Sequence, residues 1–120
     1  MPSEEERLKV LIVDDDAPFR EVLADLAARA FYQVYSCGDG SEAVGLIQRE
    51  VLDLVVTDLL MPGIDGLGVL KAVRESQPET LVIIITGHAS LQTAIEAIRQ
   101  GAYDYIRKPF KLEEMSLALK

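Results

Sequence analysis

Three short stretches of this 120-residue chain are continuously apolar and rich in β-branched side chains. They lie near residues 8–13, 53–57 and 81–85, and they lack the polar–apolar alternation of a half-exposed strand. Continuous apolar strands are typical of parallel sheets that are covered on both faces. With weaker strands expected near 33–36 and 103–107, the sequence predicts a sheet of five strands.

Helical patterns fill the intervals between these strands. Helices are expected over 18–30, 41–50, 66–76 and 90–100, and a short last helix begins near Leu112. The apolar residues expected to face inward are Phe19, Val22, Leu23, Leu26, Ala27 and Ala30, then Ala43, Val44 and Ile47, then Leu67, Val69, Leu70 and Val73, then Leu91, Ala94, Ile95 and Ile98. Short strands that alternate with helices predict an α/β fold with right-handed crossovers and helices on both faces of the sheet.

Asp16, Ser41 and Ser90 precede predicted helices and have the side chains that cap a helix N-terminus. Pro18 suits the first turn of its helix, and Gly101 suits the end of the fourth.

Composition limits the function classes. The net charge of −8 argues against nonspecific binding of nucleic acid or an anionic membrane by this segment. Cys37 is the only cysteine, so a disulfide framework or a cysteine-based zinc site is not expected, and a reducing cytoplasm fits. Residues 1–7 lack the apolar centre of a signal peptide, and the longest apolar run, Leu81–Ile85, is too short to span a bilayer.

Polar residues follow the predicted strands. They are the run Asp14–Asp16, then Asp58, Thr86 and Lys108. In doubly wound sheets ligands bind beyond the carboxyl ends of the strands, so these side chains are expected to share one site.

The chemistry of this set points to phosphoryl transfer. Asp14, Asp15 and Asp58 supply hard oxygen ligands that suit Mg²⁺, or alternatively Mn²⁺. Thr86 offers a hydroxyl and Lys108 a positive charge, which together with a cation could neutralise a phosphoryl group. Asp58 is the candidate nucleophile, because a carboxylate can form an acyl phosphate. Taken singly, each residue could instead be a cap, a strand residue or a solvated lysine, but five such residues together at suitably spaced strand ends favour a site.

Four segments closely resemble the receiver domain of bacterial two-component response regulators. They are Val13–Asp16, Thr57–Gly66, Ile85–His88 and Gly101–Phe110. The resemblance covers nearly the whole chain and is strongest to receivers of the nitrogen-regulator type, which often precede a sigma-54 activator ATPase. It implies a receiver domain over residues 1–120 with a flavodoxin-like (βα)5 fold and strand order 2-1-3-4-5.

The resemblance also implies residue roles. Asp58 would accept a phosphoryl group from a histidine kinase or a phosphotransfer protein. Asp15 would bind Mg²⁺ directly, Asp14 largely through water, and the main-chain carbonyl of Leu60 would be a further ligand beside Asp58. Lys108 would pair with the phosphoryl group, and a cis Lys108–Pro109 bond would aim the lysine into the pocket.

The resemblance implies that two residues, Thr86 and Tyr105, carry the conformational change. Thr86 would move to the new phosphate and Tyr105 would swing inward behind it, which is a population shift between two packings. The face made by 91–100, 103–107 and 112–120 would then act on an output domain, a partner or a second copy of the chain. Leu60 and His88 stand where the family varies the residues that flank the phosphoryl group.

Other interpretations remain open at this point. An aspartate-nucleophile phosphohydrolase would have a second acid two residues after the nucleophile, where this chain has Leu60. A phosphate-independent interaction module would not need all five site residues. Because the chain ends at Lys120, it is either a receiver cut from a longer protein or one with a shortened last helix.

Overall fold

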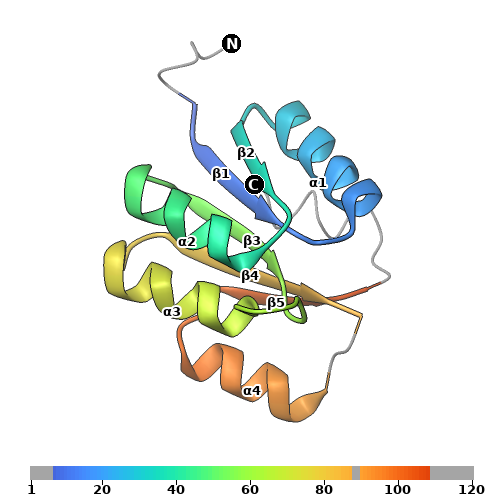
Figure 1. Cartoon of the computed structure of the whole chain (residues 1–120), viewed down its shortest axis with the longest axis vertical. Coiled ribbons are helices and arrows are strands. Elements are labelled where there is room, and N and C mark those ends of the chain that lie inside the picture. Colours follow the sequence, from blue (N-terminus) through green and yellow to red (C-terminus); the bar gives the residue numbers. More distant parts are fainter. Residues whose placement is uncertain (1–6, 88–89, 109–120) are drawn as a thin grey trace.

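The computed structural model describes residues 7–87 and 90–108, and in this part of the chain strands and helices alternate (Figure 1). The elements are β1 (Lys9–Val13), α1 (Ala17–Arg29), β2 (Gln33–Cys37), α2 (Gly40–Arg49), β3 (Leu54–Asp58), α3 (Gly66–Ser76), β4 (Leu81–Thr86), α4 (Leu91–Arg99) and β5 (Asp104–Arg107). The predicted elements within the described residues are confirmed, with bounds that differ by only one or two residues. The predicted last helix, His88 and the Lys108–Pro109 bond lie outside the described residues.

The strands form one parallel sheet in the order β2-β1-β3-β4-β5. This order confirms the predicted flavodoxin-like fold. At the end of β1, Val13 pairs with Cys37 of β2 and Thr57 of β3, and Asp58 lies opposite Ile85 of β4. The carboxyl ends of neighbouring strands therefore meet at one edge of the sheet.

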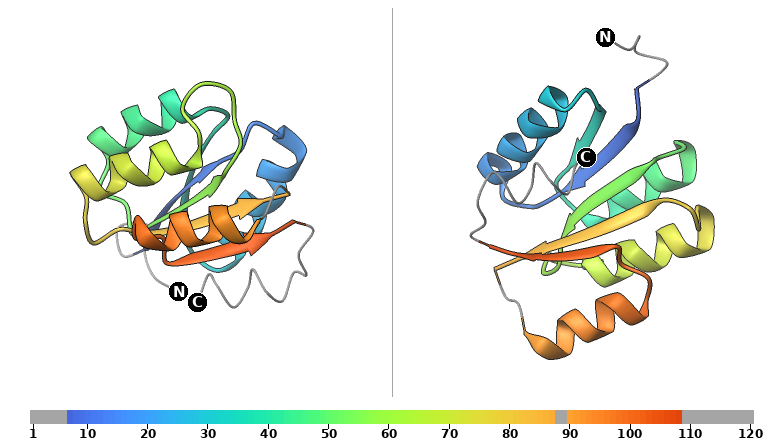
Figure 2. Two further views of the ribbon diagram at one scale, coloured as in Figure 1. Left: turned by 90° about the horizontal axis from the view of Figure 1, so that it is seen from below. Right: turned by 180° about the vertical axis from the view of Figure 1, so that it is seen from behind.

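Helices cover both faces of the sheet. Helix α1 lies on one face, and α2, α3 and α4 lie on the other (Figure 2). Alternate residues of β1 divide between the two sides: Leu11 and Val13 join the core beneath α2 and α3, whereas Val10 and Ile12 join the core beneath α1. This double burial explains why the central strands are continuously apolar.

The predicted caps are confirmed for two helices and wrong for one. Asp16 caps α1 by accepting the N–H of Phe19, and Ser90 caps α4 in a reciprocal capping box with Thr93. Ser41 does not cap α2. That helix begins one residue earlier, at Gly40, and the side chain of Asp39 accepts the N–H of Glu42 at 2.8 Å.

The predicted inward face of α4 is largely wrong. Leu91, Ile95 and Ile98 are 78%, 44% and 54% exposed, whereas Ala97 is fully buried and Ala94 partly so. The helix packs on the sheet through its small side chains and turns its large apolar side chains outward. In α1 the predicted inward residues Val22 and Ala30 are also exposed, because the buried stripe is narrower and centres on Leu23 and Ala27.

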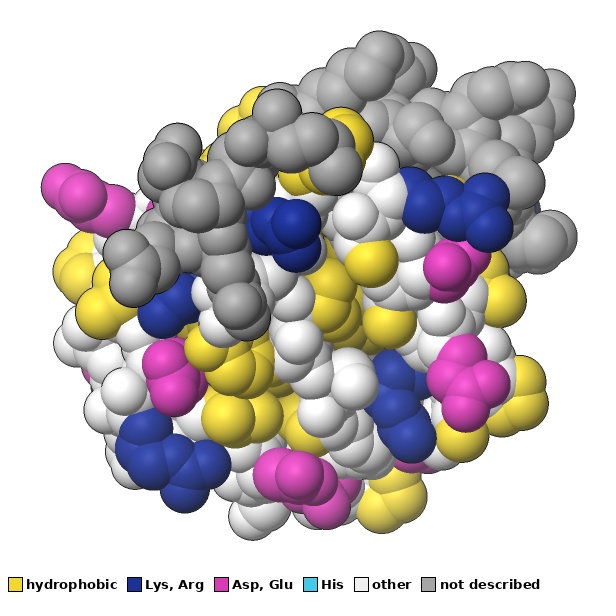
Figure 3. Space-filling view, turned by 90° about the horizontal axis from the view of Figure 1, so that it is seen from above, with side chains coloured by type: hydrophobic (Ala, Val, Ile, Leu, Met, Phe, Trp, Pro, Cys, Tyr) yellow, Lys and Arg dark blue, Asp and Glu magenta, His cyan; other side chains and the backbone are white. Residues whose placement is uncertain are grey.

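Among the described residues, no helix combines the length and the hydropathy that crossing a membrane requires. On the face drawn in Figure 3, acidic and basic side chains are interspersed around exposed hydrophobic ones rather than gathered by sign.

Candidate functional site

The carboxyl edge of the sheet brings the predicted site residues together. Asp14 and Asp15 follow β1, Asp58 ends β3, Thr86 ends β4 and Lys108 follows β5. One carboxylate oxygen from each of the three aspartates lies within 4.8 Å of the others. The topology thus converts residues that are far apart in sequence into one acidic cluster.

Asp14 is the most enclosed member of the cluster, with a relative exposure of 1%. Its Oδ1 accepts the N–H of Asp16 at 2.9 Å, and its Oδ2 accepts from Lys108 Nζ at 3.0 Å. Its main-chain carbonyl accepts from Arg20 Nη1 at 2.7 Å. A buried charge needs such partners, and here they also fix the loop that carries Asp15.

Asp58 lies beside this pair and is held less tightly. Its Oδ1 accepts the N–H of Leu59 at 2.8 Å, and its Oδ2 is 3.5 Å from Lys108 Nζ. Burial, followed by the charge of Asp14, raises the pKa of Asp58 above its usual range, although Lys108 opposes both effects. The charged carboxylate is therefore held at some free-energy cost, which a further cation would relieve.

Interactions of both its backbone and its side chain position Lys108. Its N–H donates to the carbonyl of Thr86 at 2.8 Å, which ties the end of β5 to the end of β4. Its ammonium reaches back across the sheet to Asp14 and Asp58, and the side chain is only 20% exposed. The side chain of Thr86 is fully buried at the same edge.

The loop after β3 depends on a glycine. The N–H of Gly66, the first residue of α3, donates to the carbonyl of Leu59 at 2.8 Å. A Cβ at Gly66 would collide with the main-chain carbonyl of Asp58, so only glycine allows this close approach. Leu60 lies in this loop at the carboxyl edge, with its side chain 50% exposed.

Tyr105 connects β5 to α4 instead of joining the acidic cluster directly. It is half-buried, and its hydroxyl lies 2.7 Å from Thr93 Oγ1. Thr93 also forms the capping box with Ser90, so the tyrosine is tied to the first turn of α4. A movement of Tyr105 would therefore alter the start of that helix.

The structure adds two residues that the sequence did not identify as part of the site. Arg20 binds the carbonyl of Asp14, and the ring centroid of Phe19 lies 4.1 Å from Lys108 Nζ. Their only signal in the sequence is their position in the first turn of a helix that starts at the acidic run. Asp16 is the cap of this helix and is not part of the three-aspartate cluster.

Cys37 ends β2 next to this edge, and it is buried. Burial, reinforced mainly by Glu42, raises the pKa of its thiol to about 11. The thiol is therefore protonated at neutral pH, which makes it a poor metal ligand.

The acidic cluster fits a divalent cation. Three carboxylate oxygens within 4.8 Å of one another are spaced so that one ion could contact them all. Asp15 is exposed, so the site opens to solvent and an ion could keep some of its waters.

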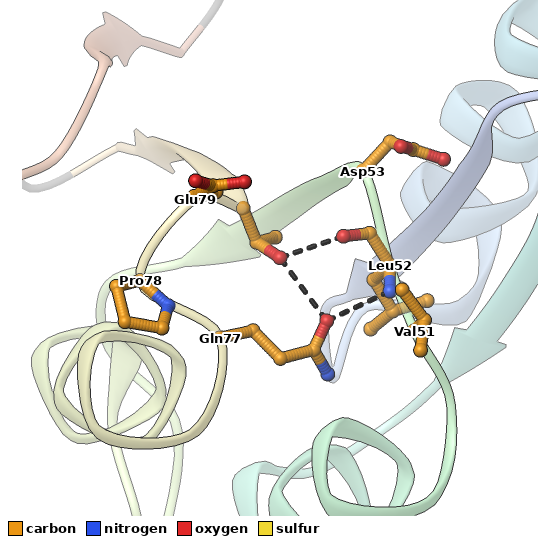
Figure 4. A pocket seen from close by; sticks show the side chains of 7 residues that line it. Val51, Leu52, Asp53, Gln77, Pro78 and Glu79 are labelled. Carbon is orange, nitrogen blue, oxygen red and sulfur yellow. Dashed lines mark hydrogen bonds between the residues drawn. The ribbon is translucent and has the colours of Figure 1, made fainter.

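A surface pocket of about 560 Å³ lies at the opposite, amino edge of the sheet, lined by Val51, Leu52, Asp53, Gln77, Pro78, Glu79 and Thr80 (Figure 4). Gln77 and Thr80 both line it, and their side chains are engaged in hydrogen bonds that include the backbone of Leu52. None of the predicted site residues lines this pocket.

The sequence pattern of the family described as the response regulator receiver domain matches residues 10–120. The chain belongs to this family. It is a receiver domain for phosphorylation-dependent signalling, and its cluster of Asp14, Asp15 and Asp58 is typical of a receiver's phosphoacceptor site. A receiver is a phosphoacceptor and not a classical enzyme, so the family favours this interpretation over a phosphohydrolase.

The receiver resembles regulators of the nitrogen-regulator type, as predicted. It is 37% identical to the regulatory protein AtoC of Escherichia coli over 93% of its own length and 24% of that protein. It is 38% identical to the transcriptional regulator NtrC of Salmonella typhimurium over 88% of its length and 22% of that protein. The chain thus spans about a quarter of the length of these curated relatives.

Solved receivers share the fold. The receiver domain of NtrX from Brucella abortus superimposes with a TM-score of 0.83 at 34% identity, covering 91% of this chain and 92% of that one. A response regulator from Burkholderia pseudomallei, solved with a phosphorylated aspartic acid, calcium and citrate, gives a TM-score of 0.86 at 30% identity over 94% of this chain and 66% of that one.

Proposed function

We propose that Asp58 is the phosphoacceptor of this receiver and that Lys108 stabilises the transferred group. The observation that carries the proposal is the position of the Lys108 ammonium, 3.0 Å from Asp14 Oδ2 and 3.5 Å from Asp58 Oδ2. A single positive charge thus serves two carboxylates and lies beside the one whose pKa burial raises. The addition of a phosphoryl group would bring more negative charge to this lysine.

The donor is a phosphohistidine of a histidine kinase or of a phosphotransfer protein. A carboxylate oxygen of Asp58 attacks the phosphorus, the P–N bond to the donor imidazole breaks, and the imidazole nitrogen keeps the electron pair and takes up a proton. The product is an acyl phosphate on Asp58. The chain contributes orientation and charge: Leu59 holds Oδ1, and Lys108 lies ready to contact the phosphoryl oxygens.

Mg²⁺, or alternatively Mn²⁺, is the cation that we assign to the cluster; when bound it would neutralise the charge that develops on the transferred oxygens. Asp15 and Asp58 would be its direct carboxylate ligands, and the main-chain carbonyl of Leu60 would complete the protein's contribution. Asp14 would act mainly through water. The hydrogen bonds that both oxygens of Asp14 already accept support this division, as does the exposure of Asp15.

The switch consists of Thr86 and Tyr105. Thr86 lies at the strand end next to Lys108, from which its hydroxyl would turn to the new phosphoryl group. Tyr105 would then exchange its bond to Thr93 for an inward position, loosening the first turn of α4. The exposed Leu91, Ile95 and Ile98 of α4 make this helix, with β5 and the following residues, the surface that we assign to signalling.

In the cell we expect this receiver, residues 1–120, to work in the cytoplasm as one part of a longer protein. Its relatives AtoC and NtrC are about four times as long, which supports an output domain in the full chain. Phosphorylation would act on that output domain or on a second copy of the receiver, without direct contact of this domain with nucleic acid or a membrane.

The test is Mg²⁺-dependent labelling by a small acyl phosphate, read by intact mass and by mapping the modified peptide. Wild-type protein should gain one phosphoryl group on Asp58, and Asp58→Asn should gain none. Asp25→Asn is the matched control, because Asp25 is an exposed aspartate of α1 paired with Arg29. A label that persists in Asp58→Asn, or that forms equally well without Mg²⁺, would refute the assignment.

A further inference from the structure

The ammonium of Lys108 has a third neighbour besides the two carboxylates. Its Nζ lies 4.1 Å from the centroid of the Phe19 ring, within the range of a cation–π contact. The lysine side chain is 20% exposed, so this contact is partly shielded from water. Because a cation–π attraction strengthens as water is removed, the ring is a real partner for the charge.

The position of the ring follows from the start of α1. Asp16 caps the helix by accepting the N–H of Phe19 at 3.3 Å, which places Phe19 in the first turn, directly after the acidic loop. The ring also packs against the core on the α1 face of the sheet. The ring is therefore held by the helix cap and by packing against the core, and it forms a fixed surface beside the lysine side chain.

A lysine side chain needs such a surface to stay in one place. Its charge sits on a flexible stem with four methylene groups, so the ammonium can leave the site unless contacts confine it. Asp14 and Asp58 attract the ammonium from the side of the acidic cluster, and Asp58 changes its charge distribution when it accepts a phosphoryl group.

We propose that Phe19 is a positioning residue that keeps the ammonium of Lys108 at the reacting edge, where it can meet the incoming phosphoryl group. This inference rests on the proposed function of Asp58 and Lys108. It adds a residue from α1 to a site otherwise built from strand ends.

The first measurement is the labelling rate with a small acyl phosphate at saturating Mg²⁺. Phe19→Leu keeps an apolar side chain but removes the ring, and we expect the rate to fall about fivefold. Phe19→Tyr keeps the ring face and should label at close to the wild-type rate. Phe31→Leu is the matched control, since it is the same change in the turn that follows α1, where Phe31 is 46% exposed.

The second measurement reads the contact without any phosphorylation. The Lys108 side-chain protons lie close to the Phe19 ring, so their NMR resonances should carry a ring-current shift. That shift should disappear in Phe19→Leu and persist in Phe19→Tyr and in Phe31→Leu. The shift reports the contact itself; a role confined to packing would not make the labelling rate depend on the aromatic face.

Two results would overturn the inference: lysine resonances that are the same in Phe19→Leu and wild type, or a Phe19→Leu variant that labels as fast as wild type. A wild-type protein that takes no label would overturn the proposed function instead, and the lysine resonances would still decide whether Phe19 holds Lys108. The two failures are therefore distinguishable.

Discussion

The two edges of the sheet differ in how fully their polar groups are compensated. At the carboxyl edge three aspartates lie together, two of them, Asp14 and Asp58, share the ammonium of Lys108, and the charge of Asp14 helps to raise the pKa of Asp58. At the amino edge Gln77 is neutral and uses both ends of its amide. Its Nε2 donates to the carbonyls of Ile47 and Glu50, both at 2.6 Å, and its Oε1 accepts from the N–H of Leu52 at 2.8 Å.

This contrast separates stability from reactivity. The amide of Gln77 joins the end of α2 to the loop before β3, and the hydroxyl of Thr80 completes the junction by donating to the carbonyl of Leu52 at 2.6 Å (Figure 4). Satisfied polar groups of this kind fix a structure. The carboxyl edge instead keeps excess negative charge, which favours the arrival of a cation. Changes at the two edges should therefore alter stability in opposite directions.

The largest effect is expected at the amino edge. Gln77→Ala leaves the N–H of Leu52 and the carbonyls of Ile47 and Glu50 without their side-chain partner, so the free energy of unfolding should fall by about 3 kcal/mol. Urea denaturation measures this loss, with the exposed Gln48→Ala of α2 as the matched control. Labelling of Asp58 should persist wherever the variant is folded. A loss no greater than that of Gln48→Ala would mean that the junction does not stabilise the fold.

At the carboxyl edge, removal of a charge should stabilise the protein. Without Mg²⁺ at pH 7, Asp58→Asn should raise the free energy of unfolding by about 1 kcal/mol, because the folded state no longer holds a poorly solvated carboxylate beside Asp14. Thermal denaturation checks this gain, with Glu21→Gln, an exposed acid of α1, as the control.

The sign of the pH dependence follows from the same shift. Because the folded-state pKa of Asp58 is raised, the folded protein binds more protons than the unfolded chain in the interval between the ordinary and the raised value. Asp58 therefore makes the wild type lose stability as the pH rises through that interval, and Asp58→Asn should remove this part of the loss. The gain in the free energy of unfolding should be smaller below the ordinary aspartate pKa than at pH 7. If Asp58→Asn stabilised the protein equally at both pH values, the electrostatic explanation would be contradicted.

The smallest effect concerns the link from the site to α4. Tyr105→Phe deletes one hydroxyl that bonds Thr93 and should lower the free energy of unfolding by about 1 kcal/mol or less. In a Thr93→Val background the same change should have almost no effect, because its partner is already gone. Additive losses in this double-mutant cycle would show that the two hydroxyls do not interact.

The edges also differ in how well the sequence predicts them. The carboxyl edge could be predicted because the three central strands are continuous apolar runs, so a polar residue that follows one of them, such as Asp58, stands out. Parallel pairing then brings these strand ends together. Gln77 had no comparable signal, since its partners are main-chain groups that folding alone brings near.

The errors have physical causes too. The apolar spacing of α4 predicted that Leu91, Ile95 and Ile98 would be buried, but the helix packs through Ala97. Hydrophobic periodicity identifies a helix with an apolar stripe, yet it does not say whether that stripe meets the sheet or a partner. Phe19 was predicted as a core residue; the sequence could not show that its ring also meets a charge contributed by residue 108.

One measurement tests the central claim most directly. The claim is that the carboxyl edge carries uncompensated negative charge, which a divalent cation binds and neutralises. The free energy of unfolding should rise with Mg²⁺ as RT ln(1 + [Mg²⁺]/Kd), which is about 2.7 kcal/mol at a hundred times Kd. The rise should persist in Gln77→Ala and be much smaller in Asp15→Asn. A free energy of unfolding that does not respond to millimolar Mg²⁺, or that responds equally in Asp15→Asn, would contradict the account.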